Sequence, residues 1–172
     1  MKKFIMAKFI GLLLTGHVTA QVAPGIYEFA HAVAKAEGFT VKGSLPNRLH
    51  NPGDIRAVSA HQYPGQIGID KKRYAIFKND AAGWAALYHQ IEKVADGSSA
   101  HYGPQTTIRQ FSRRYAEVSS PWLKNVCSIL VISPSTTFER YFNSNRSLVL
   151  AAERAPVDPM QTFDYDFLGG TQ

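Results

Sequence analysis

The chain has 172 residues, 45% of them hydrophobic, and a formal net charge of +6. This length and composition indicate one globular domain with a sizeable core. Cys127 is the only cysteine, which excludes an internal disulfide, and its apolar neighbours favour a small buried side chain over a nucleophilic thiol.

The first twenty residues have the pattern of a secretory signal peptide. A basic leader precedes a short apolar run from Phe9 to Thr15, and Val18 and Ala20 then provide the small residues of a cleavage site. The apolar run is too short for a stable membrane span. We therefore predict a signal peptide over residues 1–20, a secreted or periplasmic protein, and no integral membrane span after the signal is removed. A retained N-terminal anchor is the alternative.

Apolar residues then recur at helical spacing up to the carboxylate of Glu37. They are Ile26, Phe29, Ala30, Val33 and Ala34. This spacing predicts a helix over residues 26–37 that ends before Gly38 and carries Glu37 on its apolar stripe. Partial burial and the negative end of the helix both disfavour the charged form of Glu37, as a general acid near neutral pH requires. The alternative is a solvated residue in the last helical turn.

The remaining elements are predicted from turn residues and caps. Residues 38–65 are rich in Gly, Pro and Asn, which predicts a long irregular loop of the kind that is usually functional. We expect a hairpin from residues 66–69 and 73–77, a helix capped by Asn79 or Asp80, a helix opened by the capping box of Thr107 and Gln110, and a helix from Ser120. The whole is mainly α with one short β-hairpin.

The charge changes sign towards the C-terminus. Residues 21–133 include 13 basic and 8 acidic residues, a formal balance of +5, whereas residues 134–172 include 3 and 5, a balance of −2. We predict a catalytic domain over residues 21–133 and a C-terminal extension over residues 134–172 that is partly helical and then irregular. A basic body suggests an anionic polymer as partner, namely cell-wall glycan, nucleic acid or a membrane surface.

Five short blocks follow one another along the chain. They are Ala36–Phe39, Asn47–Arg48, Asn51–Arg56, Tyr74–Phe77 with Ala82–Trp84, and Thr107–Ile108 with Arg114–Ala116. In this order they resemble the lysozyme-like superfamily, specifically its secreted and phage-borne lytic-transglycosylase-like domains, over about residues 26–133. The Gly-Leu-Met-Gln block of the commoner transglycosylases is absent, and Arg114–Ala116 is a distant counterpart of their Tyr-Asn-Ala-Gly element.

The resemblance implies a lysozyme-like α+β fold, in which a helical bundle-like lobe accompanies one hairpin and a long active-site loop. It implies cleavage of the β-1,4 bond between N-acetylmuramic acid and N-acetylglucosamine in peptidoglycan, with Glu37 as acid and then base and no cofactor. If Asp54 does not serve as a second carboxylate, the substrate's own N-acetyl group can assist the departure of the leaving oxygen. The product is then the 1,6-anhydro ring, and the resemblance favours this lytic transglycosylase reaction; attack by water gives hydrolysis instead.

Five further residues are candidates for the site. Asp54 is the one plausible second carboxylate, although it also fits a cap of the Pro-Gly turn. Amides and aromatic faces suit sugar rings, and the candidates for substrate contacts are Asn51, Asp54, Tyr74, Tyr102 and Tyr115. Each also has a structural interpretation: Asn51 can cap the turn, and Tyr115 can fill the core and orient the carboxyl of Glu37.

Other chemistries are not indicated. His50 and His61 lie eleven positions apart without Cys or Glu at ligand spacing, so no metal site is predicted. Phosphate-binding loops and serine-nucleophile elbows are absent from the sequence. The competing function is a non-catalytic peptidoglycan-binding module with a lysozyme-like fold. A nucleic-acid-binding domain ranks last, because the interleaved aromatic and basic residues of a stacking platform are missing. A secretion, conjugation or phage apparatus is the further partner considered.

Overall fold

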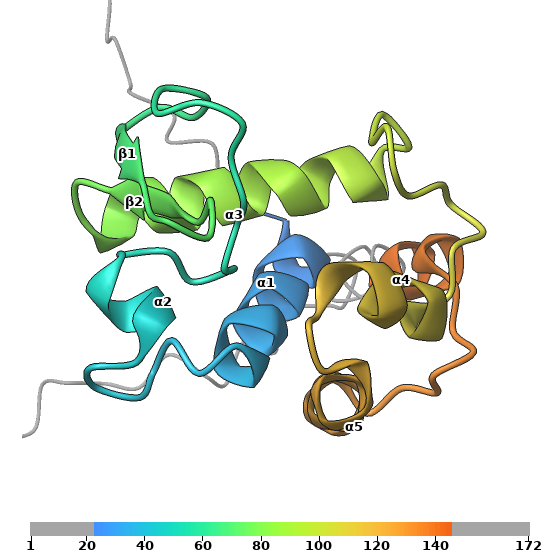
Figure 1. Cartoon of the computed structure of the whole chain (residues 1–172). Coiled ribbons are helices and arrows are strands. Elements are labelled where there is room, and N and C mark those ends of the chain that lie inside the picture. The colour runs from blue at the N-terminus through green and yellow to red at the C-terminus, as the bar shows by residue number, and fades with distance from the viewer. Residues whose placement is uncertain (1–22, 146–172) are drawn as a thin grey trace, which may run out of the picture.

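The computed structural model describes residues 23–145, which form a mainly helical fold with one two-stranded antiparallel hairpin. The predicted leader and the residues after 145 lie outside the described part. The elements in order are α1 (Pro24–Ala36), α2 (Leu45–Arg48), β1 (Gln66–Ile69), β2 (Ala75–Phe77), α3 (Asp80–Ala95), α4 (Ile108–Tyr115), α5 (Ser119–Leu130) and a further helix over 138–145. Figure 1 shows α1 in the middle, with α2 and the hairpin on one side and α4 and α5 on the other.

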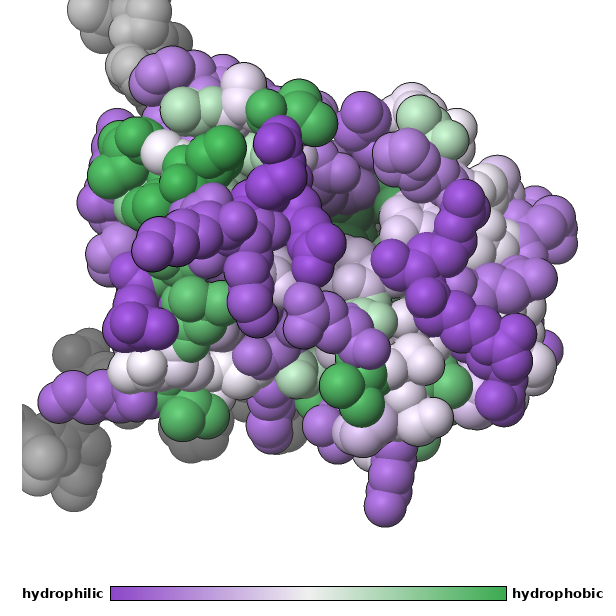
Figure 2. Space-filling model, in the orientation of Figure 1, coloured by the Kyte–Doolittle hydropathy of each residue, from purple (hydrophilic) through white to green (hydrophobic). Residues whose placement is uncertain are grey.

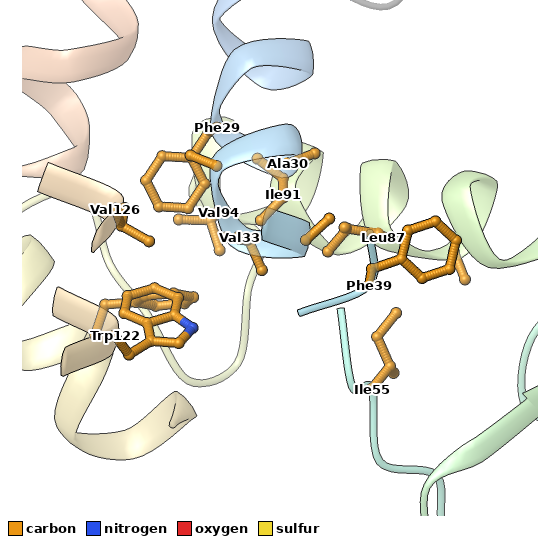
Figure 3. Close-up of a cluster of buried hydrophobic side chains, with 14 of the residues drawn as sticks. Phe29, Ala30, Val33, Phe39, Ile55, Leu87, Ile91, Val94, Trp122 and Val126 are labelled. Atoms are coloured by element: carbon orange, nitrogen blue, oxygen red, sulfur yellow. The ribbon is translucent and has the colours of Figure 1, made fainter. Parts of the chain in front are cut away.

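Helix α1 is the centre of the packing, because one of its faces is wholly apolar. Phe29, Ala30 and Val33 are 0% exposed and pack against α3 and α5 (Figure 3). The core is dominated by aromatic rings: Phe29 makes edge-to-face contacts with Phe111 and Phe138, with centroids 5.9 and 5.5 Å apart. Such contacts add stability beyond the area that the rings bury. The predicted first helix is confirmed, with Glu37 as the residue that caps its C-terminus.

The hairpin and the later helices follow the predicted signals. Strands β1 and β2 pair antiparallel, the Asn79 side chain caps α3, and both bonds of the Thr107–Gln110 capping box are present at α4. Helix α5 begins at Ser119, one residue before the predicted start. Within residues 23–145, no helix is long and apolar enough to cross a bilayer.

The segment predicted as one long loop contains a short helix. Ser44 accepts a hydrogen bond from the backbone N–H of Asn47 and so begins α2, with a proline in its first turn. The prediction missed α2 because its four residues give no apolar periodicity, and only the cap marks it.

The predicted boundary after residue 133 does not separate two structural units. Phe138 and Phe142 are 1% and 5% exposed and belong to the core, and the backbone N–H of Ile108 bonds to the carbonyl of Thr136 at 3.0 Å. The Tyr141 hydroxyl donates to the carbonyl of Gly25 at 3.3 Å. Residues 134–145 are therefore part of the same domain, since the aromatic residues of the last helix close the core beside α1. The change in charge that suggested the boundary says nothing about packing.

Candidate active site

A cleft of about 730 Å³ opens between the two sides of the fold. One wall consists of residues 54–58 with Tyr74, and the other of the end of α4, the link to α5 and the first turn of α5. Apolar residues of α3 form the floor, and Glu37 lies where α1 reaches the cleft. Figure 2 shows this hollow near the middle of the face, with hydrophobic surface at its base and hydrophilic side chains around it.

Glu37 is held at the cleft by the end of α1. Its backbone N–H bonds to the carbonyl of Val33, and Gly38 takes a φ of +80°, which ends the helix. The side chain is half-buried, and the indole Nε1–H of Trp122 donates to Glu37 Oε1 at 2.8 Å. Trp122 is 4% exposed and packed against Tyr115, so the carboxyl has a fixed orientation.

The surroundings of Glu37 raise its pKa to about 7. Burial is the largest cause, followed by the negative charge of Asp54; the hydrogen bond from Trp122 acts in the opposite direction, and Glu117 raises the pKa further. At neutral pH a large fraction of Glu37 therefore carries the proton that general-acid catalysis needs.

Asp54 is the second carboxyl group of the cleft. It lies in the loop after Pro52-Gly53 with a φ of 44°, an uncommon conformation that aspartate tolerates better than most residues. Its Oδ1 is buried and has no hydrogen-bond partner within residues 23–145. Burial, then the charges of Glu117 and Asp70, raise the pKa of Asp54 to about 6, against the lowering effect of Arg56. A carboxylate that served only as a turn cap would have its oxygens on backbone N–H groups.

The three candidate tyrosines all line the cleft. The hydroxyl of Tyr115 donates to the carbonyl of Gly53 and not to Glu37, so it fixes the loop that carries Asp54. A Cβ at Gly53 would lie 2.7 Å from the end of the Leu87 side chain and 3.0 Å from this hydroxyl, so a larger residue would have to displace both. Tyr102 packs on Phe111 with centroids 4.6 Å apart.

Asn51 does not line the cleft. It is 0% exposed, its Nδ2 donates to the carbonyls of Ile55 and Ala75, and its Oδ1 accepts from the N–H of Ile55. The structural interpretation of this residue therefore accounts for all that it does. It ties the cleft loop to β2 from inside the protein.

Sequence reasoning did not identify Glu117 or Trp122 as residues of the site. Glu117 accepts hydrogen bonds from the Tyr74 hydroxyl and from Arg56, both at 2.9 Å. These bonds join the two walls of the cleft, because Arg56 and Tyr74 belong to one wall and Glu117 to the other. The only signal was the place of Glu117 two residues after Tyr115, which without a structure does not identify its partners.

His50 and His61, the two histidines of the long loop, do not line the cleft. His50 Nδ1 lies 2.6 Å from Asp80 Oδ1 at the start of α3. Within the part of the chain that the structure describes, no group of three or more His, Cys, Asp or Glu side chains is placed to hold a metal ion.

No protein-family model, curated protein sequence or solved structure matches this chain. Its function is therefore inferred from the site itself and from the resemblance of its short sequence blocks.

Proposed function

We propose that this protein cleaves the glycan strands of peptidoglycan at the β-1,4 bond between N-acetylmuramic acid and N-acetylglucosamine, as a lytic transglycosylase. The observation that carries the proposal is Glu37: a half-buried carboxyl in a cleft, oriented by the Trp122 indole, with a pKa of about 7. A proton held in this way can be given to a glycosidic oxygen at neutral pH.

In the proposed reaction, Glu37 donates its proton to the bridging oxygen as the bond from that oxygen to C1 of the muramic acid breaks. The leaving N-acetylglucosamine then carries the new hydroxyl group. The ionised Glu37 next accepts the proton of the muramic acid 6-hydroxyl as its oxygen bonds to C1. This step forms the 1,6-anhydro ring, returns Glu37 to its protonated form and consumes no water.

Asp54 is proposed to act as the ionised partner of this acid. With a pKa of about 6 against about 7 for Glu37, it loses its proton first as the pH rises, so between these two pKa values the pair holds about one proton. A carboxylate in this cleft would stabilise the positive charge that develops at C1. The Oδ1 of Asp54, which has no partner among residues 23–145, supports this role. A buried carboxylate oxygen without a hydrogen bond destabilises the fold, and a catalytic function is one reason for such a group to be present.

The test is the product of cleavage. The chain without its predicted leader should release soluble muropeptides from purified peptidoglycan, and mass spectrometry should find 1,6-anhydro-muramic ends. Glu37→Gln keeps the shape and removes the proton, so release should fall at least about 10³-fold. Glu92→Gln, an exposed carboxylate of α3 outside the cleft, is the matched control and should behave as wild type.

Each other outcome of this experiment indicates a different function. Hydrated muramic ends would replace the transglycosylase with a muramidase that uses the same acid. Sedimentation with peptidoglycan and no release by either form would refute the catalytic proposal and leave the non-catalytic binding module.

A further inference from the structure

The cleft carries positive charges that the proposed cleavage reaction does not use. Arg56, Arg73, Lys93 and Arg114 all line it. Arg56 is paired with Glu117 at 2.9 Å. Among residues 23–145, the other three have no carboxylate within ion-pair distance. We call Arg73, Lys93 and Arg114 the cationic rim.

Two members of the cationic rim lie at the α3–α4 end of the cleft, beside Tyr102. Arg114, near the end of α4, donates from Nη1 to the carbonyl of His101 at 2.9 Å, and its guanidinium carbon is 6.0 Å from the centre of the Tyr102 ring. Lys93 is on the last turn of α3, and its carbonyl accepts a hydrogen bond from the N–H of Ser99, the first residue of the 99–102 segment that lines the cleft. The guanidinium of Arg114 therefore lies over the Tyr102 ring, where the carbonyl of His101 and the aromatic face hold it at the cleft.

Arg73 holds the opposite wall. Its Nη2 donates to the carbonyls of Ala57 and Val58 at 3.1 and 2.7 Å, so two backbone oxygens fix the guanidinium in place. A guanidinium has five N–H donors, and the remaining ones are free of any hydrogen bond to residues 23–145. A held cation with spare donors suits a carboxylate ligand.

The distribution of charge restricts which anion fits. Glu37, Asp54 and Glu117 all line the cleft, and the charge of an ionised Asp54 acts on Glu37, so a polymer with a negative charge on every ring would be repelled beside the acid. The ligand must be neutral at the bond that is cut and anionic at its side branches. Peptidoglycan has this pattern, because its sugars are uncharged and the peptide stems on the muramic lactyl groups end in carboxylates.

We propose that the cationic rim binds stem-peptide carboxylates, so that the protein prefers stem-bearing glycan strands to strands from which an amidase has removed the stems. This inference rests on the proposed function and names the substrate within its class. It also explains why these three cations have no ion-pair partner in the described part of the chain, whereas Arg56, which bridges the walls, pairs with Glu117.

The experiment compares two soluble substrates of equal sugar length, one with stems and one treated with N-acetylmuramoyl-L-alanine amidase. For wild type, kcat/KM should be about tenfold higher with stems, in keeping with one or two charge-assisted hydrogen bonds, and the ratio should fall as NaCl is raised. Arg114→Gln should lower the ratio several-fold and Arg114→Lys should recover part of it. The matched control is Arg113→Gln, the exposed neighbour on α4 that does not line the cleft, which should keep the wild-type ratio.

Binding to the inactive Glu37→Gln form, followed by fluorescence anisotropy of labelled strands, separates the two proposals. Equal cleavage of both substrates, or an Arg114→Gln ratio equal to that of wild type, would overturn the cationic rim and leave the cleavage reaction standing. Absence of cleavage would overturn the proposed function; in that case, tighter anisotropy binding of stem-bearing strands supports the rim and equal binding overturns it.

Discussion

One loop of the cleft carries two polar side chains, three residues apart, that the fold treats in opposite ways. Asn51 is fully buried and all three of its hydrogen bonds go to backbone groups. Asp54 is half-buried, has a φ of 44° and keeps a buried oxygen with no partner among residues 23–145. A fold normally satisfies its buried polar groups. The contrast therefore indicates that Asn51 stabilises the loop, whereas Asp54 is held by the loop at the cleft.

The largest expected effect on stability comes from removing the side chain of Asn51. Asn51→Ala leaves the N–H of Ile55 unpaired in the core, at about 1–3 kcal/mol for such a group, and removes one hydrogen bond from each of the carbonyls of Ile55 and Ala75, at about 1 kcal/mol each. The Ile55 carbonyl keeps its bond from the N–H of Ala75. We expect the free energy of unfolding to fall by about 3–5 kcal/mol in chemical denaturation. Asn125→Ala, at an exposed position of α5, should change it by less than about 1 kcal/mol. Equal effects at both positions would contradict the role given to Asn51.

Removing the carboxyl group of Asp54 should have the opposite effect on stability. The pKa of Asp54 is raised in the folded protein to about 6 from an ordinary value near 4. Folding therefore loses stability as the pH rises from about 4 to about 6, and the loss remains above that pH. Asp54→Asn removes this loss, so at pH 7 the variant should be more stable than wild type by about 1–2 kcal/mol and cleave peptidoglycan far more slowly. Thermal unfolding at pH 4 and pH 7 is the measurement, and a variant that loses stability at pH 7 would show that the carboxylate is structural.

A smaller effect is expected on the proton of Glu37 itself. Trp122→Phe removes the Nε1–H that stabilises the ionised carboxyl, so the pKa of Glu37 should rise and the alkaline limb of the pH–rate profile should move to higher pH. Trp84→Phe, an indole of α3 that does not line the cleft, is the control. A profile that does not move would mean that the indole only packs.

The smallest effect is expected from Glu117, on one wall of the cleft. Glu117 raises the pKa of both Glu37 and Asp54, so Glu117→Gln should move both limbs of the profile to lower pH. The shift should shrink with added salt because Glu117 is exposed. Glu139→Gln, at an exposed position outside the cleft, should leave the profile unchanged. A move of only one limb would show that the two carboxyl groups do not share this neighbour.

The sequence was sufficient for the features that are encoded locally. The apolar spacing before Glu37, the cap at Asn79 and the capping box at Thr107 each predict a helix end that the structure contains. The hairpin follows from its short alternating segments. The position of Glu37 at the end of a half-buried helix was also predictable, since it depends on one stripe and one glycine.

The features that depend on distant contacts could not be read in this way. The bond from Trp122 to Glu37 spans 85 positions and that from Tyr74 to Glu117 spans 43, and no local pattern encodes either. The same holds for Tyr115, a candidate for a substrate contact whose alternative was to orient the carboxyl of Glu37; its hydroxyl bonds to the carbonyl of Gly53. The boundary placed after residue 133 failed because charge was used where only packing of Phe138 and Phe142 decides.

The contact between the first and last helices has a consequence for engineering. The Tyr141 hydroxyl meets the carbonyl of Gly25, and a Cβ at Gly25 would lie 2.9 Å from the Asn145 side chain. The two ends of the described domain are therefore neighbours in space, which is the condition for circular permutation. Joining them with a short flexible linker and opening the chain in the exposed turn at Gly97-Ser98 should give a rearranged polypeptide that still folds around the same acid.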